Sequence, residues 1–195
     1  DTITLYWNTH ILATITVGAT QIWPIPVDVE WSVFLDGGFA SRYPVRVWYE
    51  FTSGPLTRNS LDTFIEVDAT VAGEDPIGPD PINPTLPTVT VKGVTEDNVI
   101  TPADSPGPVL VEVFLFFDPV LGEDLQLFWG NDASYADIKL VNTGDVAGQL
   151  VKLYVQWALI VAGGGLVDVY YWTNNGVNRQ RSAATRVRVE LDTLT

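Results

Sequence analysis

The chain has 195 residues, 46% of them hydrophobic, and a formal net charge of −14 from 24 acidic and 10 basic side chains. This length suits one large domain or two of about 100 residues, and the hydrophobic fraction is sufficient for packed cores. Proteins that bind nucleic acids through the phosphates need clustered Lys and Arg, so this charge excludes nucleic acid as an expected partner.

Two residue types are missing from the chain. Without Cys there are no disulfides and no Cys-based metal site or nucleophile. Without Met, we expect a mature product or a piece of a longer protein. A Cys-free, acidic chain rich in Thr and Val suits a secreted protein, so we expect an extracellular or bacterial cell-surface location, although an acidic cytosolic protein has a similar composition. The longest apolar run, residues 109–117, is too short to span a bilayer as a helix, and we expect no membrane insertion.

The first predicted elements are short strands separated by turns. The clearest is residues 43–51 (YPVRVWYEF), where every second side chain is apolar and Arg46 and Glu50 lie between them. A period of two is typical of a strand with one buried face. Residues 1–7 (DTITLYW) and 27–31 (VDVEW) are further apolar segments, and clusters of Gly, Asn and Pro such as TSGPLTRN separate the strands.

Residues 73–87 (GEDPIGPDPINPTLP) interrupt this pattern with five prolines. Each proline fixes its own φ angle and biases the preceding residue toward extended geometry, which excludes a helix or a central strand. We therefore predict a stiff linker over residues 74–87 between two modules, residues 1–73 and 88–195, although the last part of this segment can already lie along the second module.

The segments that follow the linker match those that precede it. Leu5 and Trp7 align with Leu127 and Trp129, an offset of 122 residues that recurs after residue 43. For residues 27–31 the offset is 126 instead. Two loops whose lengths change in opposite directions, one before and one after this segment, explain the difference. We interpret the pattern as one fold built twice. The aligned segments are residues 1–7 with 123–129, 27–31 with 153–157, 43–51 with 165–173, and 60–67 with 182–189.

The predicted fold class is all-β, with each module a β-sandwich. Several short strands at intervals of about 10 residues favour this architecture, and no segment has convincing helical spacing with caps. We expect Trp31 and Trp157 to lie inside apolar strands and to bury most of their area.

The order of these segments resembles the Ig-like tandem repeats of very large bacterial surface and adhesin-like proteins. It consists of an LYW or LFW strand, an apolar strand, a Gly-rich turn, a V-x-V-x-Y strand and an S-x4-V-x-V strand. The resemblance covers almost all of the second module and residues 1 to about 73 of the first. It implies two tandem Ig-like β-sandwich modules. The chain departs from the pattern in VFLFF (residues 113–117), which is more aromatic than usual.

The first module has no counterpart of residues 92–122 and so lacks at least one N-terminal strand. Such a sandwich leaves apolar core uncovered and a backbone edge unpaired. Three explanations stay open: the strand lies in sequence absent from this chain, another subunit donates it by strand complementation, or the first module is simply smaller.

Residues 109–117 are apolar on both faces, which predicts a strand covered on both sides. On one face, Leu110, Phe114 and Phe116 either pack under the proline-rich segment or form a contact surface. We therefore take as candidate assembly residues Leu110, Phe114, Phe116, Trp7 and Trp48.

Little in the sequence suggests catalysis, and we predict that the chain is not an enzyme. The only histidine is His10, whose neighbours do not suggest a catalytic triad, and no glycine-rich phosphate loop is present. Acidic residues collect around the predicted joint, where calcium is a candidate ligand, although solvated turns explain them as well. The candidate metal ligands are Asp75, Asp80, Glu96 and Asp97.

The main functional hypothesis is a structural repeat segment of an extracellular or surface protein, acting as spacer, scaffold or filament-forming subunit. Its expected partner is itself, as neighbouring repeats or subunits. The alternative is an adhesive module that binds a glycan or a host protein through exposed aromatics such as Trp23, Trp48 or Trp172.

Overall fold

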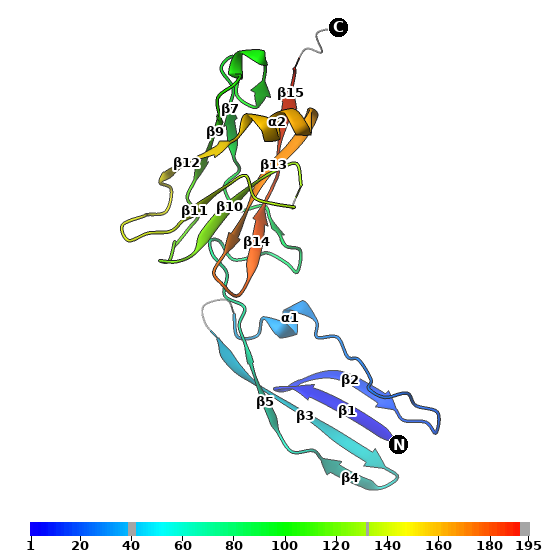
Figure 1. Ribbon diagram of the computed structural model, residues 1–195. Coiled ribbons are helices and arrows are strands. Elements are labelled where there is room, and N and C mark those ends of the chain that lie inside the picture. Colours follow the sequence, from blue (N-terminus) through cyan, green and yellow to red (C-terminus); the bar gives the residue numbers. More distant parts are fainter. Residues whose placement is uncertain (39–41, 132, 192–195) are drawn as a thin grey trace. The chain divides into compact units, whose positions relative to one another are not determined.

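The computed structural model describes residues 1–38, 42–131 and 133–191. The chain divides into two compact units, Asp1–Thr70 and Val71–Thr195, which we call unit 1 and unit 2. Their regular structure consists mainly of strands with only short helical segments among the described residues, so the prediction of an all-β chain is confirmed (Figure 1). Within the same residues, neither the length nor the apolar character of any helix suffices to cross a bilayer.

Unit 1 is built on one antiparallel sheet. Strand β1 (Thr2–Trp7) pairs on one side with β2 (His10–Thr16) and on the other with β3 (Tyr43–Ser53). One half of the long β3 also pairs with β4 (Leu56–Asn59), and the other half pairs with β5 (Thr63–Val67). Because side chains alternate along each strand, one face of this sheet is apolar.

The core of unit 1 is small and lies at one end of that apolar face. Its buried members are Trp7, Val45 and Val67, with exposed fractions of 6%, 0% and 5%. Half-buried side chains of α1 (Trp31–Phe34) and of the segment before it pack against them. The Tyr43 hydroxyl donates a hydrogen bond to the Phe34 carbonyl, which ties α1 to the sheet.

Unit 2 contains two sheets. In the larger one, β10 (Asp124–Trp129) lies between β11 (Asp137–Leu140) and β13 (Gly165–Asn174), all antiparallel. Strand β13 continues to β14 (Arg179–Ser182) through one half and to β15 (Thr185–Val189) through the other. Two short strands extend this sheet in parallel orientation, β6 (Ile82–Asn83) beside β14 and β8 (Val99–Ile100) beside β15.

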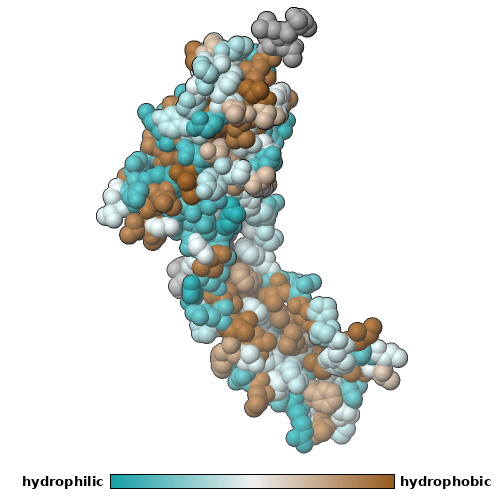
Figure 2. Space-filling model, viewed as in Figure 1, coloured by the Kyte–Doolittle hydropathy of each residue, from teal (hydrophilic) through white to brown (hydrophobic). Residues whose placement is uncertain are grey.

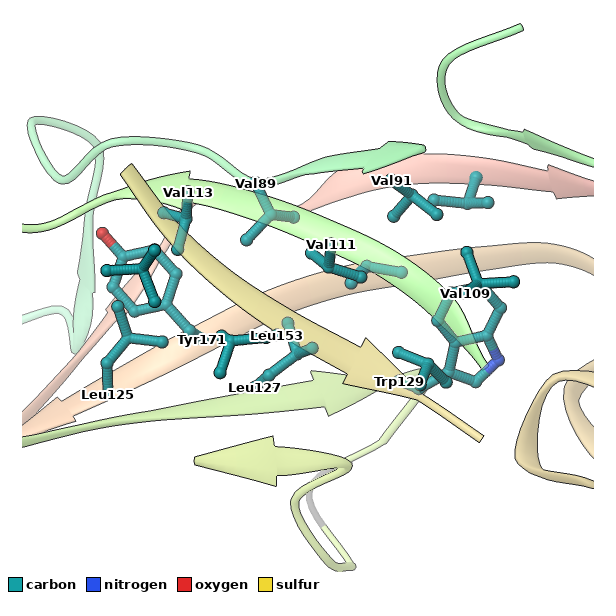
Figure 3. Packing of buried hydrophobic residues seen from close by; sticks show 14 of the residues in the cluster. Val89, Val91, Val109, Val111, Val113, Leu125, Leu127, Trp129, Leu153 and Tyr171 are labelled. Carbon is teal, nitrogen blue, oxygen red and sulfur yellow. The ribbon is translucent and has the colours of Figure 1, made fainter. Parts of the chain in front are cut away.

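The smaller sheet of unit 2 covers the larger one. Its central strand β9 (Val109–Phe114) pairs with β12 (Leu150–Val155) and with β7 (Thr90–Lys92). Figure 3 shows valines of β7 and β9 facing Leu127 and Tyr171 of the larger sheet across one continuous core. Val111, Leu127 and Tyr171 have no exposed surface.

The prediction that Trp31 and Trp157 lie inside strands is wrong, because they begin helices α1 and α2 (Trp157–Gly163). Both residues nevertheless bury most of their area, as expected. In α2, Trp157 and Ile160 are three residues apart on one face, and Ile160 is fully buried while Val161 is 52% exposed. A short apolar run can be buried as a helical turn as well as a strand. A 3₁₀ turn (Pro102–Asp104) is the third helical segment described.

The predicted linker over residues 74–87 belongs to unit 2, so the division falls after Thr70 rather than after residue 73. Its strand β6 pairs with β14, and Leu86 is 2% exposed in the core. The Asn83 amide donates to the Gln180 Oε1 atom at 2.9 Å and to the Glu74 carbonyl at 2.8 Å. Gln180 in turn donates to the Ala72 carbonyl at 2.9 Å. These buried amides bind the proline-rich segment to the sheet, which proline content alone does not reveal.

Three of the four strand ladders of unit 1 coincide with ladders of unit 2 at an offset of 122 residues, whereas the β1–β2 register differs from that of β10–β11 by two residues. The backbone N–H of Tyr49 donates to Ser60 Oγ, and that of Tyr171 to Ser182 Oγ, at the same offset. Helices α1 and α2 instead match at an offset of 126, with Glu30 and Gln156 as N-caps. The matching strand pairs are Thr2↔Thr52 with Asp124↔Asn174, Tyr43↔Val67 with Gly165↔Val189, and Glu50↔Asn59 with Trp172↔Arg181.

Unit 1 lacks a second sheet within its described residues. Strands β6 to β9 of unit 2 all lie before residue 123, where the offset finds no residues of unit 1 to match them. Residues 25–29 match β12 at the offset of 126, but they form no ladder. Among the described residues of unit 1, α1 and the segment before it cover the apolar face of the sheet.

Candidate assembly surface in unit 1

The uncovered part of the unit 1 sheet is the first candidate site. Its extent follows from comparing the exposed fractions of equivalent residues in the two units. Tyr49 is 44% exposed, whereas its equivalent Tyr171 is fully buried. Ile65 is 38% exposed, whereas its equivalent Val187 is fully buried. The difference arises because β7 and β9 cover the sheet of unit 2. We call this region the open face. Figure 2 shows hydrophobic side chains gathered over the surface of unit 1.

An apolar groove of about 360 Å³ runs along the open face. One wall is the sheet itself, and the other is the segment that matches β12. In that segment Ile25, Val27 and Val29 are half-buried while Pro26 and Asp28 are exposed, the same alternation as in β12. The groove is lined by Ile3, Leu5, Ile15, Trp23, Pro24, Ile25, Val27 and Tyr49.

The backbone on one side of the groove is also unpaired. In unit 2, Val151, Leu153 and Val155 of β12 pair with β9. None of the described residues hydrogen-bonds to the backbone of their unit 1 equivalents Ile25, Val27 and Val29. Extended backbone groups without partners at an apolar groove can accept an added strand.

Two of the five candidate assembly residues are core residues, because Trp7 is 6% exposed and Phe116 has no exposed surface. A Cβ atom on Gly73 would lie 3.0 Å from the Phe116 Cβ, so the proline-rich segment covers this ring. That is one of the two alternatives that the sequence left open.

Trp48, Leu110 and Phe114 remain accessible. Trp48 is half-buried on the outer face of the unit 1 sheet, stacks on Tyr6 with centroids 4.0 Å apart, and has Arg46 over its ring. Phe114 is 55% exposed at the end of β9, and Leu110 is half-buried on the same strand. None of these three lines the groove of unit 1.

The four candidate metal ligands all lie in unit 2 but do not gather. Asp80 Oδ1 accepts the Ile82 N–H at 2.8 Å, and the Asp97 carboxylate pairs with Lys92 at 2.6 Å. The hydrogen bond with Asp97 raises the pKa of Lys92, which keeps this pair charged. Among the described residues, no three acidic or histidine side chains are grouped in a way that could hold a metal ion. Asp75 and Glu96 do not add a third ligand to either site.

His10 lies at the start of β2 in unit 1. Its Nε2 atom is 3.5 Å from Asp36 Oδ2, and both side chains are close to half exposed. An exposed pair of this kind is an ordinary surface contact, because general-base catalysis needs a nucleophile within hydrogen-bond distance of the histidine.

A second groove, of about 630 Å³, lies beside α2 in unit 2. Trp129, Asp168 and Arg186 line it, and the Arg186 Nε atom is 3.0 Å from Asp168 Oδ1. The Trp129 indole N–H is buried without a partner among the described residues. The equivalent Trp7 has the same unpartnered N–H in unit 1, so this feature follows the shared packing of the two units rather than a ligand site.

Among the sequence predictions were an uncovered apolar core and an unpaired backbone edge in the first module, but not the residues that form the open face. Tyr49 and Ile65 appeared there only as aligned strand residues, and Ile25 was not considered. The alternation of Ile25, Val27 and Val29, set against the missing counterpart of residues 92–122, indicates which wall a missing strand leaves bare.

Comparisons with known proteins add no neighbour to this description. The chain matches no protein-family model, no curated protein and no solved structure.

Proposed function

We propose that this chain is a structural repeat segment of an extracellular or cell-surface protein, and that it serves as a load-bearing spacer or scaffold. The observation that carries the proposal is the coincidence of strand registers in the two units, which supports a duplicated module of the Ig-like kind. Repetition of a β-unit builds length and stiffness, and the described residues offer little catalytic chemistry beside it.

The ladder between β8 and β15 gives unit 2 a means of bearing load. These strands are parallel, with Arg188 beside Val99 and Val189 beside Ile100. The Arg188 N–H donates to the Asn98 carbonyl at 3.0 Å, and the Glu190 N–H donates to the Ile100 carbonyl at 2.8 Å. Tension that reaches β8 from its N-terminal side and β15 from its C-terminal side pulls these parallel strands in opposite directions. All their hydrogen bonds are then loaded together in shear.

The proline-rich segment adds a second parallel contact. Strand β6 lies beside β14, and the Arg181 N–H donates to the Pro81 carbonyl at 2.7 Å. The buried Asn83 and Gln180 amides fix the same segment. In unit 1, by contrast, the first strand β1 and the last strand β5 both pair antiparallel with β3, and neither parallel contact has a counterpart among its described residues.

Pulling the chain between its ends by single-molecule force spectroscopy tests this proposal. We expect two unfolding steps, with length gains of up to about 250 Å for unit 1 and about 450 Å for unit 2 at full extension. Unit 2 should unfold at the higher force. The variant Ile100→Pro removes an N–H from the parallel ladder and should lower that force, whereas Ile82→Ala, on the exposed side of β6, serves as a control.

Unfolding of unit 2 at a force no higher than that of unit 1 would contradict the load-bearing role. A single unfolding step would contradict the modular one.

An adhesive module is the second candidate, and the groove beside α2 favours it. A volume of about 630 Å³ with Trp129 in its wall and an ion pair at its border suits a small polar ligand such as a glycan. Glycan-array binding that Asp168→Ala abolishes would support this candidate. Binding that Asp168→Ala leaves unchanged would contradict it.

A further inference from the structure

We infer that the open face of unit 1 binds an extended strand from outside residues 1–195, which seats antiparallel to residues 25–29 with an apolar side chain at every second position. This inference rests on the proposed repeat architecture, because unit 2 shows what occupies the equivalent face. There, Val109, Val111 and Val113 of β9 enter the core, each at most 3% exposed. The occupant of unit 1 takes the place of β9.

Unit 2 also defines which backbone groups face that occupant. The Gln149 carbonyl accepts the Leu115 N–H at 2.8 Å, so the odd-numbered groups of this strand point toward β9. The Tyr154 N–H donates to Asp137 Oδ2 at 2.8 Å, on the side away from β9. At the offset of 126, Ile25, Val27 and Val29 take the positions that face β9, and Asp28 takes that of Tyr154. The occupant therefore pairs with the backbone of Ile25, Val27 and Val29.

The two prolines of this segment lie on the opposite edge. Pro24 and Pro26 match Leu150 and Lys152, whose N–H groups point away from β9 by the same alternation. Because proline has no N–H, these residues remove two donors from the outer edge, where the Asp28 N–H remains, while Ile25, Val27 and Val29 keep their donors on the inner edge. This arrangement blocks strand addition on one side and permits it on the other.

The negative charge of unit 1 indicates which side chains the bound strand should carry. Unit 1 has eight acidic and three basic side chains, none of them lysine. In unit 2, Leu110 of β9 lies beside Tyr154, which is the equivalent of Asp28. The residue of the occupant that takes the place of Leu110 therefore lies beside Asp28. A lysine or arginine there would face the Asp28 carboxylate across the two strands. The occupant is thus an apolar, alternating strand with a basic residue at an outward position.

A peptide with the sequence of β9 tests the inference on the full chain. The probe is residues 107–116 carrying Leu110→Lys and Phe114→Lys, so that the three inward valines are kept and two of the three outward positions are basic, the third being Glu112. We expect the amides of Ile25, Val27 and Val29 to become protected from hydrogen exchange, while that of Asp28 does not. At a peptide concentration about 100 times Kd, exchange through opening of unit 1 should slow about a hundredfold.

Matched variants separate strand addition from non-specific apolar binding. Val27→Pro removes an N–H that faces the occupant and should abolish binding, whereas Asp28→Pro removes one that faces away and should leave backbone pairing intact. A control peptide that also carries Val111→Asp should not bind. Exchange in unit 1 without peptide shows whether each variant is still folded.

Three results would overturn the inference. These are no binding of the probe, binding that Val27→Pro leaves unchanged, and peptide-free dimers in which residues 25–29 are protected, which would assign the face to a second copy. The force experiment needs no peptide and measures unit 2, so failure of one proposal is distinguishable from failure of the other.

Discussion

Unit 1 and unit 2 share three strand ladders but not their cores. The same registers recur at an offset of 122 residues, yet the equivalents Tyr49 and Tyr171 differ from 44% to 0% exposed. Only unit 2 has β7 and β9, which close the second side of its core. The comparison shows that an alternating pattern of apolar and polar residues is enough to form the sheet. Whether the apolar side chains are buried depends on a second layer of structure.

The equivalent tyrosines give the largest expected effect. Tyr171→Ala removes a fully buried ring and should lower the free energy of unfolding of unit 2 by about 3–5 kcal/mol. Tyr49→Ala removes a ring that borders an open groove and should cost unit 1 only about 1 kcal/mol. Hydrogen exchange resolved for each unit along a urea series measures both values on the same chain.

The β9 peptide sharpens this comparison, because it covers Tyr49 as β9 covers Tyr171. With the peptide bound, the cost of Tyr49→Ala in unit 1 should rise by at least about 1 kcal/mol. Equal costs for the two tyrosines without peptide would contradict the assignment of the open face.

Substitutions of Gln180 and of its unit 1 equivalent Arg58 should give the next largest difference in stability between the two units. Gln180→Ala leaves the Ala72 and Glu74 carbonyls and the Asn83 amide short of partners in a buried site, which should destabilise unit 2 by about 2–4 kcal/mol. Arg58 is exposed on β4, so Arg58→Ala should change unit 1 by about 0.5 kcal/mol or less.

Limited proteolysis provides a second measurement for Gln180→Ala. If the buried amides hold the proline-rich segment on the sheet, the variant should be cut within residues 74–87 before the rest of unit 2 opens. A variant that unfolds only as a whole would instead show that the segment is held mainly by Leu86 and β6.

The strands of both units were predictable because their signals are local. Val45 and Val47 alternate with charged residues, and the same pattern recurs around Val187. For the proline-rich segment, the sequence left open whether its last part lies along the second module, because its attachment depends on Asn83 and Gln180, which are 97 residues apart. Local conformational rules carry no information about such a contact.

The helix that begins at Trp157 and the open face of unit 1 are two further features that could not be predicted from the sequence of each segment alone. A seven-residue apolar run is compatible with a strand or a helix, and in the structure it forms helix α2 with Ile160 buried. The open face is defined by a strand that is missing, so the sequence of unit 1 alone does not identify it. Comparison with unit 2 does.

The smallest expected effect concerns Glu123, which unit 2 buries to 8% exposure at the start of β10. Burial raises the pKa of this carboxyl, and the nearby negative Asp118 raises it further, while the Val120 N–H opposes the shift. A carboxyl whose pKa is higher in the folded protein binds its proton more tightly there. Unit 2 should therefore lose stability as pH rises from the ordinary glutamate pKa to the raised one.

Glu123→Gln removes this titration while keeping the shape of the side chain and a hydrogen-bond acceptor for the Val120 N–H. Thermal unfolding of unit 2 followed from acid to neutral pH should show a decline across that window in the unmodified chain and a flatter profile in the variant. Asp118→Asn removes the neighbouring charge and should shift the decline to lower pH. A gain in stability of the unmodified chain relative to Glu123→Gln over the same window would reverse the sign of the argument, and would mean that the hydrogen bond from Val120 outweighs the burial of the charge.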